Sequence, residues 1–514
     1  MTCWMNLGQN LKVNAKKFPT TVALTDRSRS FTYPQTNERV NRLANNLLGL
    51  GLSKGDRVAV LMENSIEIIE LYLATAKTGL VIVPINFRLV GPEISYITNN
   101  SDAKAFVVHD EFAAEVDRVK NELVNIAAAN YFIVGAQREG YRPYETLIDG
   151  GSAAEPEIAV APEDTWILIY TSGTTGKPKG VIRSHASHIA FYLINAVDFG
   201  FNEHDFCMNV MPLCHINSTF FTFIFLYIGA SVYVHPAQSF RPEEILEIVE
   251  REKVTFISLI PTHYNLILNA PEDALKRDVS SIRKLLCSSA PVRKSMKECI
   301  MGYFKGVELY EGYGSTEAGI VTVLKPEYQM KKLGSIGFET LGTEFVKVLD
   351  ENGNEVPDGE VGELCSRGPM LFDEYYKLPD KTAESFVDGW FSAGDMARKD
   401  ADGFFEIVDR KDNMIITGGE NVYPSEVEEV VGGHPDVFDA AVIGLPDDKW
   451  GERVAAVVIK KPGTDLDEDS MRIYCKDKMA GYKRPKDIIF IESAAMPRTA
   501  TGKILHRILR EKYA

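Results

Sequence analysis

The sequence is poor in cysteine and has no closely paired ones. Seven thiols are spread over 514 residues, and no Cys-x-x-Cys pair occurs. A disulfide framework and a structural zinc site both need paired, regularly spaced cysteines, so we expect neither. Reduced thiols are typical of the cytosol, and we therefore expect a cytoplasmic protein.

A long apolar segment is also missing. The longest run, residues 220–234, falls short of the roughly 20 residues that cross a bilayer, and Gly229 and Ser231 interrupt it. It predicts a buried helix followed by a strand. The first residues lack a basic stretch before an apolar one, and the last four are no peroxisomal signal. We therefore expect neither a secretory leader nor that address.

Basic residues are outnumbered by acidic ones. The 56 Lys and Arg face 72 Asp and Glu, which gives a formal net charge of −16. Long-range attraction to nucleic acid or anionic lipid is therefore disfavoured, and any polyanion must be held by a local site. We expect small-molecule partners, no nucleic acid and no integral membrane association.

Apolar runs alternate with amphipathic ones through the first half of the chain. Residues 56–62 and 80–85 are expected strands, and a helix between them is expected to start at Ser65 and end at Gly79. Fully apolar strands joined by helices indicate parallel sheets covered on both faces. After residue 340, short strands with acidic glycine turns predict a β subdomain. We predict an α/β fold with two parallel-type αβ sheets in a large domain, residues 1–411. That domain includes the β subdomain at about 340–408, and a small α+β domain follows at residues 412–514.

The densest polar motif follows an apolar strand directly. It spans Tyr170 to Gly180 and combines hydroxyls, glycines and lysines, which suit a loop that wraps a polyphosphate. It is not a Walker A loop, because only two residues separate Gly173 from Gly176 and Lys177 precedes a proline. A flexible surface loop would not explain hydroxyls at this density.

This motif and six further segments resemble the adenylate-forming superfamily of acyl-CoA synthetases, peptide-synthetase adenylation domains and firefly luciferase. The segments occur in the family's order over nearly the whole chain: Pro212–His215, Glu311–Glu317, Gly362–Leu364, Trp390–Asp395, Asp409–Asp412 with Gly418–Pro424, and Pro497–Lys503. The Gly-Gly-Glu-Asn sequence at 418–421 resembles the acyl-CoA synthetase branch. The resemblance implies an N-terminal adenylation domain, a mobile C-terminal domain and an AMP-dependent acid–CoA ligase.

Such a ligase would activate a carboxylic acid in two steps. The acid and ATP would give an acyl-adenylate and pyrophosphate, and coenzyme A would then take the acyl group and release AMP. Charge builds on the α-phosphate in the first step, so Mg²⁺ and fixed cations are needed there. A second outcome is open, in which a free-standing adenylating enzyme delivers its acyl group to a carrier protein.

The resemblance assigns ATP-binding roles to residues of several segments. The pyrophosphate would be held around Thr171, Ser172, Gly173, Thr174, Thr175 and Lys179, and adenine would lie against Ser289, Ala290, Pro291 and Tyr313. Asp395 would accept the ribose hydroxyls, Arg410 would make a second ribose or phosphate contact, and Glu311 and Gly312 would also belong to the ATP site. Thr316 would touch the α-phosphate, and Glu317 would help to hold Mg²⁺. Ordinary packing is an alternative for Tyr313 and for residues 289–291.

The resemblance also places the acyl and coenzyme A sites. The acyl pocket would be lined by His215, Ile216, Asn217, Ser218, His263, Tyr264, Gly312, Gly319 and Ile320. Amino-acid-activating relatives carry an aspartate in the segment matching 211–220, and none occurs here, so a neutral aliphatic (fatty) or aromatic acid is expected. Asn217 and Ser218 could bind a hydroxyl or oxo group. His215 would gate the thiol path rather than act as a base, with a core histidine as the alternative. Coenzyme A would meet Gly418, Gly419 and Glu420, and Asp412 would be the hinge.

Other readings stay open at this point. A luciferase-like oxidase shares every motif, and a homodimer is compatible with the sequence. A non-catalytic paralogue would be expected to lose Lys503 or Glu317, and both are present.

Lys503 gives the first testable prediction. Its place after Thr501-Gly502 matches the family's catalytic lysine, which bridges the substrate carboxylate and the α-phosphate. We expect Lys503→Ala to slow adenylation by at least the ~10²-fold typical of losing one transition-state donor. Acid-dependent pyrophosphate release measures this, and an undiminished rate would show that Lys503 is only a solvated charge.

Overall fold

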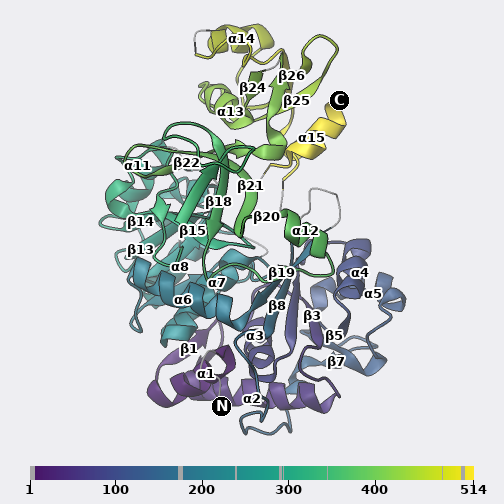
Figure 1. Ribbon diagram of the computed structural model, residues 1–514. Coiled ribbons are helices and arrows are strands. Elements are labelled where there is room, and N and C mark those ends of the chain that lie inside the picture. The colour runs from purple at the N-terminus through teal and green to yellow at the C-terminus, as the bar shows by residue number, and fades with distance from the viewer. Residues whose placement is uncertain are drawn as a thin grey trace. The chain divides into compact units, whose positions relative to one another are not determined.

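The computed structural model describes residues 6–171, 178–237, 240–288, 292, 294–343, 345–418, 420–476, 478–498 and 504–514. The chain forms two compact units (Figure 1). The first comprises residues 1–333, 339–345 and 366–391, and the second comprises 334–338, 346–365 and 392–514. The predicted division between residues 411 and 412 stays a prediction.

One sheet of the first unit carries the polar loop identified above. Its strand order is β19-β9-β8-β4-β3-β5-β6-β7. The strands from β8 to β7 run parallel, whereas β8–β9 and β9–β19 are antiparallel pairs. The bounds are β3 Arg57–Leu61, β4 Val81–Ile85, β5 Ala103–His109, β6 Tyr131–Val134, β7 Arg142–Pro143, β8 Thr165–Thr171, β9 Lys179–Ser184 and β19 Glu374–Tyr375.

The second sheet of this unit runs in the order β15-β14-β13-β12-β10-β11-β1-β2. Its central strands are parallel, and the hairpins β14–β15 and β1–β2 are antiparallel. The strand bounds are β1 Val22–Thr25, β2 Ser30–Thr32, β10 Phe206–Asn209, β11 Ser231–Val234, β12 Phe256–Leu259, β13 Lys284–Ser288, β14 Glu308–Ser315 and β15 Gly319–Leu324. β16 (Phe338–Glu339) lies where the chain passes from the second unit back to the first.

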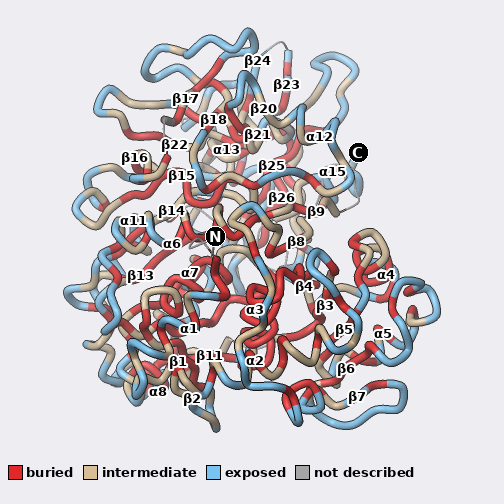
Figure 2. The backbone as a smooth tube through the Cα atoms, turned by 60° about the horizontal axis from the view of Figure 1, so that its bottom comes forward, coloured by how far each residue is buried: buried red, intermediate tan, exposed pale blue. Residues whose placement is uncertain are grey.

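Helices of the first unit cover these sheets and join them. Tyr72 of α3 lies 5.2 Å from Phe223 of α7 and 5.8 Å from Trp166 of β8, measured between ring centroids. Figure 2 shows burial concentrated in α3 and in the strands around it. The helix bounds are α1 Leu7–Lys17, α2 Tyr33–Gly49, α3 Ile66–Thr78, α4 Gly91–Asn100, α5 Ala113–Val119, α6 His185–Phe199, α7 Ile216–Ile228, α8 Pro242–Glu252, α9 Pro261–Leu268, α10 Glu272–Leu275, α11 Lys294–Tyr303 and α12 Pro379–Glu384.

The second unit contains two further sheets. Strands β17 (Phe345–Leu349), β18 (Gly362–Arg367), β21 (Trp390–Lys399) and β22 (Phe405–Arg410) belong to the predicted β subdomain. β20 (Phe386–Val387) pairs with the start of β21 at residues 390–391, which still belong to the first unit. The C-terminal sheet has the order β24-β23-β26-β25, with β27 beside β26. Its elements are β23 Ile415–Thr417, β24 Glu420–Val422, α13 Pro424–Gly432, β25 Val437–Asp447, β26 Gly451–Lys460, α14 Glu468–Lys476, β27 Asp487–Phe490 and α15 His506–Tyr513.

Alternating residues of β25 and β26 divide the C-terminal core between two faces of the sheet. Val442 and Val454 pack with α13 and α14, whereas Ile443 and Val457 pack with α15. This period of two is what a strand covered on both faces requires. The sheet is therefore a small α+β layer structure, as predicted.

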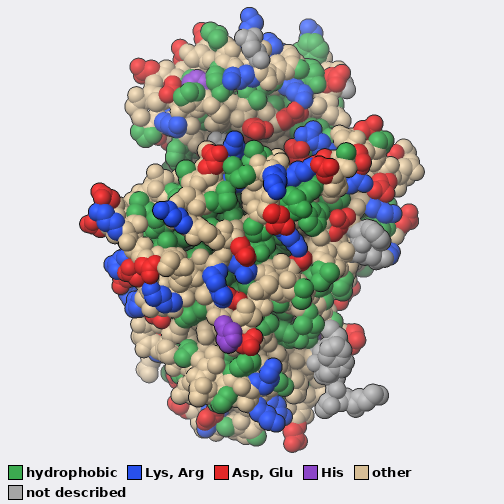
Figure 3. All heavy atoms as spheres, turned by 90° about the vertical axis from the view of Figure 1, so that its left-hand side faces the viewer, with side chains coloured by type: hydrophobic (Ala, Val, Ile, Leu, Met, Phe, Trp, Pro, Cys, Tyr) green, Lys and Arg blue, Asp and Glu red, His purple; other side chains and the backbone are tan. Residues whose placement is uncertain are grey.

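Local signals in the sequence located several elements correctly. The Ser65 side chain accepts a hydrogen bond from the Ile68 N–H before α3, and Gly79 ends that helix with φ of 68°. The apolar run 220–234 divides into the end of α7 and β11, as expected. Among the described residues, no helix is both long and apolar enough to cross a membrane. Basic and acidic side chains are interspersed on the face shown in Figure 3.

Several histidines of the first unit are buried or half-buried, and burial is the main influence on their charge. Burial lowers the pKa of His185, His215 and His263 to about 4 and puts that of His188 well below 6.5. Between pH 4 and 6.5 the unfolded chain takes up protons that the folded chain excludes. The stability that these neutral histidines contribute is therefore fully present above about pH 6.5 and is lost as the pH falls toward 4.

We expect the midpoint of thermal unfolding to be clearly lower at pH 5.0 than at pH 7.5. Each such histidine contributes a slope of up to about 1.4 kcal/mol per pH unit. His188→Phe keeps a ring beside Trp166, 4.8 Å away between centroids, and should reduce the slope. His204→Gln, at an exposed position, is the matched control and should not. Equal slopes in both variants would contradict the prediction.

Candidate functional site

The hairpin β8–β9 frames the predicted phosphate loop. Thr171 ends β8, Lys179 begins β9, and the two are partners across the pair. Ser172, Gly173, Thr174 and Thr175, which were predicted to bind pyrophosphate, lie between them, outside the described residues. Lys179 Nζ lies 4.4 Å from the centroid of the Tyr375 ring, a cation–π contact that holds the lysine at the strand end.

The hairpin β14–β15 presents Ser315, Thr316 and Glu317 in a tight turn. A Cβ on Gly314 would lie 1.9 Å from the carbonyl oxygen of Gly319, and Gly319 itself has φ of 74°. Glycine is required at 314 because the strands approach too closely for a side chain, and it is favoured at 319 because of the left-handed backbone conformation. Thr316 and Glu317 are half-buried in this turn.

Tyr375 connects the two hairpins. Its hydroxyl donates to Glu317 Oε1 over 2.8 Å, and β19 holds it beside Val181 of β9. One side chain thus contacts both Lys179 and Glu317, the predicted phosphate and magnesium residues. The sequence reasoning missed Tyr375, because no motif surrounds it.

The turn fits a magnesium–polyphosphate complex. Carboxylate oxygens are hard ligands that Mg²⁺ prefers, and Glu317 supplies them beside a lysine suited to phosphate. Among the described residues, no group of three or more His, Cys, Asp and Glu side chains could hold a metal by itself. A magnesium ion at Glu317 would therefore take most of its ligands from phosphate and water.

The predicted ribose residues are brought together in the second unit. Asp395 and Arg410 are partners across β21 and β22, with 2.8 Å between Arg410 Nε and Asp395 Oδ1. Arg410 Nη1 also donates to the Ala393 carbonyl over 2.6 Å. The arginine thus holds the carboxylate in a fixed orientation, which suits an acceptor of hydroxyl hydrogen bonds.

Glu311 of β14 forms a buried ion pair that the sequence did not predict. Its partner is Lys297 of α11, whose side chain is 0% exposed. Burial raises the pKa of Glu311, and the lysine charge opposes that rise. The nearby Gly312 and Tyr313 are half-buried in the same strand, whereas Ser289, Ala290 and Pro291 lie outside the described residues.

Asn217 is held by serines from two neighbouring strands. Ser258 Oγ donates to Asn217 Oδ1 over 3.1 Å, and Asn217 Nδ2 donates to Ser288 Oγ over 3.0 Å. Both serines lie at or near the carboxyl ends of parallel strands, where α/β sheets usually bind ligands. Ser218 instead turns inward, donating to the Met211 carbonyl over 2.5 Å and accepting from Asn209 over 2.6 Å.

The remaining acyl residues lie at the start of α7, in α9 and in the β14–β15 hairpin. His215 Nε2 is buried without a hydrogen-bond partner among the described residues. Its pKa of about 4, lowered first by burial and then by Arg88, keeps it neutral, which fits a gate better than a base. The His263 ring stacks on Phe240 at 4.1 Å between centroids. The other members are placed as follows: Ile216 half-buried, Tyr264 buried with its hydroxyl on the Leu286 carbonyl, and Gly319 and Ile320 buried in β15.

The segment predicted to meet coenzyme A forms the β23–β24 hairpin. Gly418 has φ of 62°, and a Cβ there would lie 2.8 Å from Trp450 Cε3. Glu420 is exposed at the start of β24. Gly419, Lys503 and the Asp412 side chain lie outside the described residues, although the backbone of Asp412 belongs to a short 3-10 turn, Lys411–Asn413.

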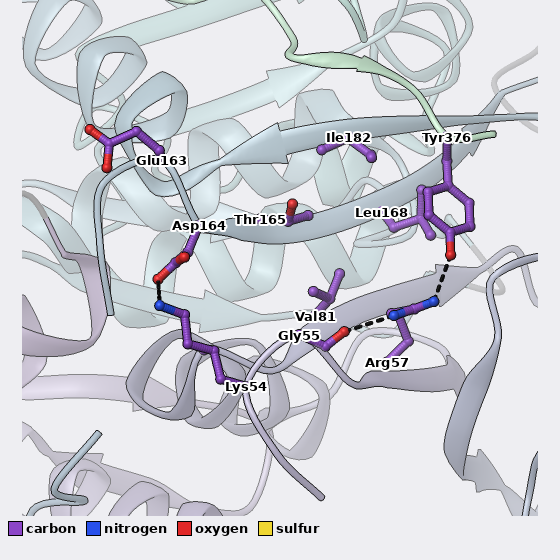
Figure 4. Close-up of a pocket in the computed structure, with 11 residues that line it drawn as sticks. Lys54, Gly55, Arg57, Val81, Glu163, Asp164, Thr165, Leu168, Ile182 and Tyr376 are labelled. Carbon is purple, nitrogen blue, oxygen red and sulfur yellow. Dashed lines mark hydrogen bonds and ion pairs between the residues drawn. The ribbon is translucent and has the colours of Figure 1, made fainter. Parts of the chain in front are cut away.

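A pocket of about 280 Å³ is lined by residues of β3, β4, β8 and β9 and by Tyr376 (Figure 4). Three of its charged groups are already paired, Lys54 with Asp164 over 2.5 Å and Arg57 with the Tyr376 hydroxyl over 2.6 Å. No predicted site residue lines this pocket, and we assign it no role in the chemistry.

The buried pair Lys297–Glu311 gives a prediction on stability. Lys297→Met leaves Glu311 without its cation, which typically costs roughly 3–5 kcal/mol for a buried pair. The pKa of Glu311 then rises further above the unfolded value near 4.5. The folded chain holds a proton that the unfolded chain releases. The loss in free energy of unfolding caused by Lys297→Met therefore grows as the pH rises.

Urea unfolding at pH 5.5 and pH 8.0 measures this deficit. The double variant Lys297→Met/Glu311→Gln removes the buried charge altogether, and its deficit should not change with pH. A deficit of the single variant that is equal at both pH values would contradict the assignment.

Comparison with known proteins covers nearly the whole chain. The family model described as "AMP-binding enzyme" matches residues 11–376, and the model "AMP-binding enzyme C-terminal domain" matches residues 426–503. Feruloyl-CoA synthase of Amycolatopsis sp is 35% identical over 502 residues, covering 97% of each chain. The long-chain-fatty-acid–CoA ligase FadD13 of Mycobacterium tuberculosis is 35% identical over 512 residues, covering 99% of each.

Other relatives widen the range of acceptors and acids. The fatty acid–[acyl-carrier-protein] ligase ScoC of Streptomyces coeruleorubidus is 33% identical over 516 residues, covering 99% of this chain and 96% of its own. The crystal structure of the anthranilate CoA ligase AuaEII with anthranoyl-AMP has a TM-score of 0.90 and 30% identity, covering 100% of this chain and 98% of that one. With both family models matched in order, the chain belongs to the AMP-binding enzyme family and to its AMP-forming acid–CoA ligase branch.

Proposed function

We propose that this ligase activates a neutral aliphatic or aromatic carboxylic acid with MgATP and transfers the acyl group to coenzyme A. One observation carries the proposal: Tyr375 contacts both Lys179 and Glu317, so a phosphate-binding cation and a metal-binding carboxylate are held beside each other. Adenylation needs this pair of charges where pyrophosphate departs.

The chain's own residues then take distinct roles. Thr171, Lys179 and the loop between them bind the departing pyrophosphate, and Thr316 orients the α-phosphate. Mg²⁺ on Glu317, when bound, neutralises charge on the phosphates. Asp395, oriented by Arg410, accepts hydrogen bonds from the ribose hydroxyls, and Lys503 bridges the carboxylate and the α-phosphate.

The acyl residues favour a substrate tail without charge. Asn217 is an amide, and the low pKa values keep His215 and His263 neutral at physiological pH. No carboxylate occurs in residues 211–220 to pair with an ammonium group. Relatives named for feruloyl, anthranilate and long-chain fatty substrates support both aryl and alkyl acids.

The acceptor of the acyl group has one alternative. ScoC is named as a ligase for an acyl-carrier protein, so delivery to such a protein is the second candidate. The Gly418–Glu420 hairpin resembles the segment that coenzyme A synthetases use, which favours coenzyme A. In this proposal the C-terminal domain turns about Asp412 between the two half-reactions.

The first test measures pyrophosphate release from ATP and Mg²⁺ over aliphatic, aromatic and amino acids, with and without coenzyme A. We expect turnover with neutral alkyl or aryl acids that depends on coenzyme A, and none with α-amino acids. Glu317→Gln should lower the rate by about 10²-fold or more and raise the Mg²⁺ requirement. Lys253→Gln, at an exposed position in the same unit, is a control that should match the wild type.

Each outcome decides between the candidates. An acid that forms adenylate while coenzyme A adds nothing would support the carrier-protein alternative. A lack of pyrophosphate release with every acid would contradict catalysis itself. A Glu317→Gln variant that keeps the wild-type Mg²⁺ response would remove Glu317 from the metal site.

A further inference from the structure

Arg183 is a fully buried arginine in the middle of β9. Its relative exposure is 0%, and its neighbours in the strand are Ile182 and Ser184. The guanidinium carbon lies 4.9 Å from the centroid of the Phe220 ring, inside the aromatic core of the first unit. No sequence motif assigned a role to this residue, although a fully buried arginine departs from the usual exposure of charged side chains.

The guanidinium binds backbone oxygens rather than a carboxylate. Nη1 donates to the carbonyl of Thr316 over 2.8 Å and to that of Glu317 over 3.2 Å, and Nη2 donates to the Met370 carbonyl over 2.6 Å. Among the described residues no carboxylate forms an ion pair with it, and its buried Nε has no partner there. The carboxylates of Asp373 and Glu317 stabilise the charge only from a distance. A buried cation without a direct ion pair is unfavourable, so packing alone does not explain an arginine at this position.

The three carbonyls belong to the two segments that form the phosphate site. Thr316 and Glu317 are the turn of the β14–β15 hairpin, and Met370 begins the segment that leads to Tyr375. A backbone hydrogen bond from Phe372 N to the Glu317 carbonyl, 2.6 Å long, joins the same two segments. Arg183 therefore fixes the turn and the Tyr375 segment against each other from inside the protein.

We propose that Arg183 is the positioning residue of the magnesium and α-phosphate turn: its buried fork sets Thr316 and Glu317, and with them the Glu317–Tyr375 hydrogen bond, in the geometry that binds MgATP. This inference rests on the proposed adenylation. Arg183 touches no substrate and acts only through the turn. Its charge also remains in place, because burial lowers the pKa of the guanidinium only to about 10.

The planar guanidinium group, with its several N–H donors, is essential to this role. Its planar nitrogens reach oxygens on two different segments at once, whereas a lysine ammonium is a single point on a flexible stem. Arg183→Lys keeps the charge and most of the volume but can hold only one segment. A shift of about 1 Å in groups that position a substrate can cost about 10²-fold in rate.

The test compares Arg183→Lys with Arg39→Lys, both measured by acid-dependent pyrophosphate exchange over a Mg²⁺ titration. Arg39 is a mostly buried arginine of α2 that pairs with Glu70 over 2.5 Å and has no part in the site. We expect Arg183→Lys to lower kcat by about 10- to 100-fold and to raise the half-saturating Mg²⁺ concentration several-fold. Arg39→Lys should lower the thermal midpoint and leave the Mg²⁺ response unchanged.

A double-mutant cycle separates positioning from a general loss of stability. If Arg183 acts through Glu317, the Arg183→Lys and Glu317→Gln effects on the Mg²⁺ response will be far from additive. Additive effects, or an Arg183→Lys variant that behaves like Arg39→Lys, would overturn the inference while leaving the ligase assignment intact. A wild-type protein that releases no pyrophosphate with any acid would instead overturn the proposed function.

Tyr375→Phe keeps the test decisive if Arg183→Lys does not fold. It removes only the hydroxyl that reaches Glu317 and leaves the ring beneath Lys179. The proposal requires a raised Mg²⁺ requirement in this variant as well. An unchanged Mg²⁺ response of folded Tyr375→Phe would overturn the proposal.

Discussion

The hydrogen bond from Tyr375 to Glu317 joins the two sheets of the first unit at the proposed site of phosphate chemistry. Tyr375 lies on β19 beside the β8–β9 hairpin, and Glu317 lies in the turn of the β14–β15 hairpin. The two sheets are connected through the packing of α3 against α7. Tyr375 lies on a packed strand and Glu317 in a tight turn between two paired strands, and such rigid elements place side chains more exactly than long loops do. The positions of Lys179 and Glu317, the two charges proposed to serve adenylation, are therefore set by the packing of the whole unit.

The sequence predicted the elements whose signals are local. α3 has its capping serine and terminal glycine within the helix ends, and the strands around it are short apolar runs. The residues of the Gly314–Gly319 turn were found differently, through the family motif at 311–317, and the turn itself is visible only in the structure. Asp395 and Arg410 were also predicted, since family motifs mark both, and they are partners across one strand pair.

The sequence could not predict contacts that depend on tertiary pairing. Tyr375 and Arg183 meet the turn only after β19, β9 and the β14–β15 hairpin have come together, and no motif records that meeting. Asn217 and Ser218 show the same limit on a smaller scale. Both were expected to line the acyl pocket, but one helical step rotates Ser218 inward to Asn209 while Asn217 meets the strand ends.

The distribution of charge in the first unit explains how one site could activate acids and still choose among them. Lys179 and Glu317, at the proposed phosphate site, are half-buried, and water can still solvate their charges. The acyl residues are an amide and neutral histidines, and burial holds the histidines neutral. An α-amino acid would have to bury its ammonium group there without a counter-ion, a penalty of several kcal/mol by the usual cost of unpaired buried charge. In the proposed function, selection against amino acids would therefore need no group that repels them, because the acyl residues offer no carboxylate to pair with the ammonium group.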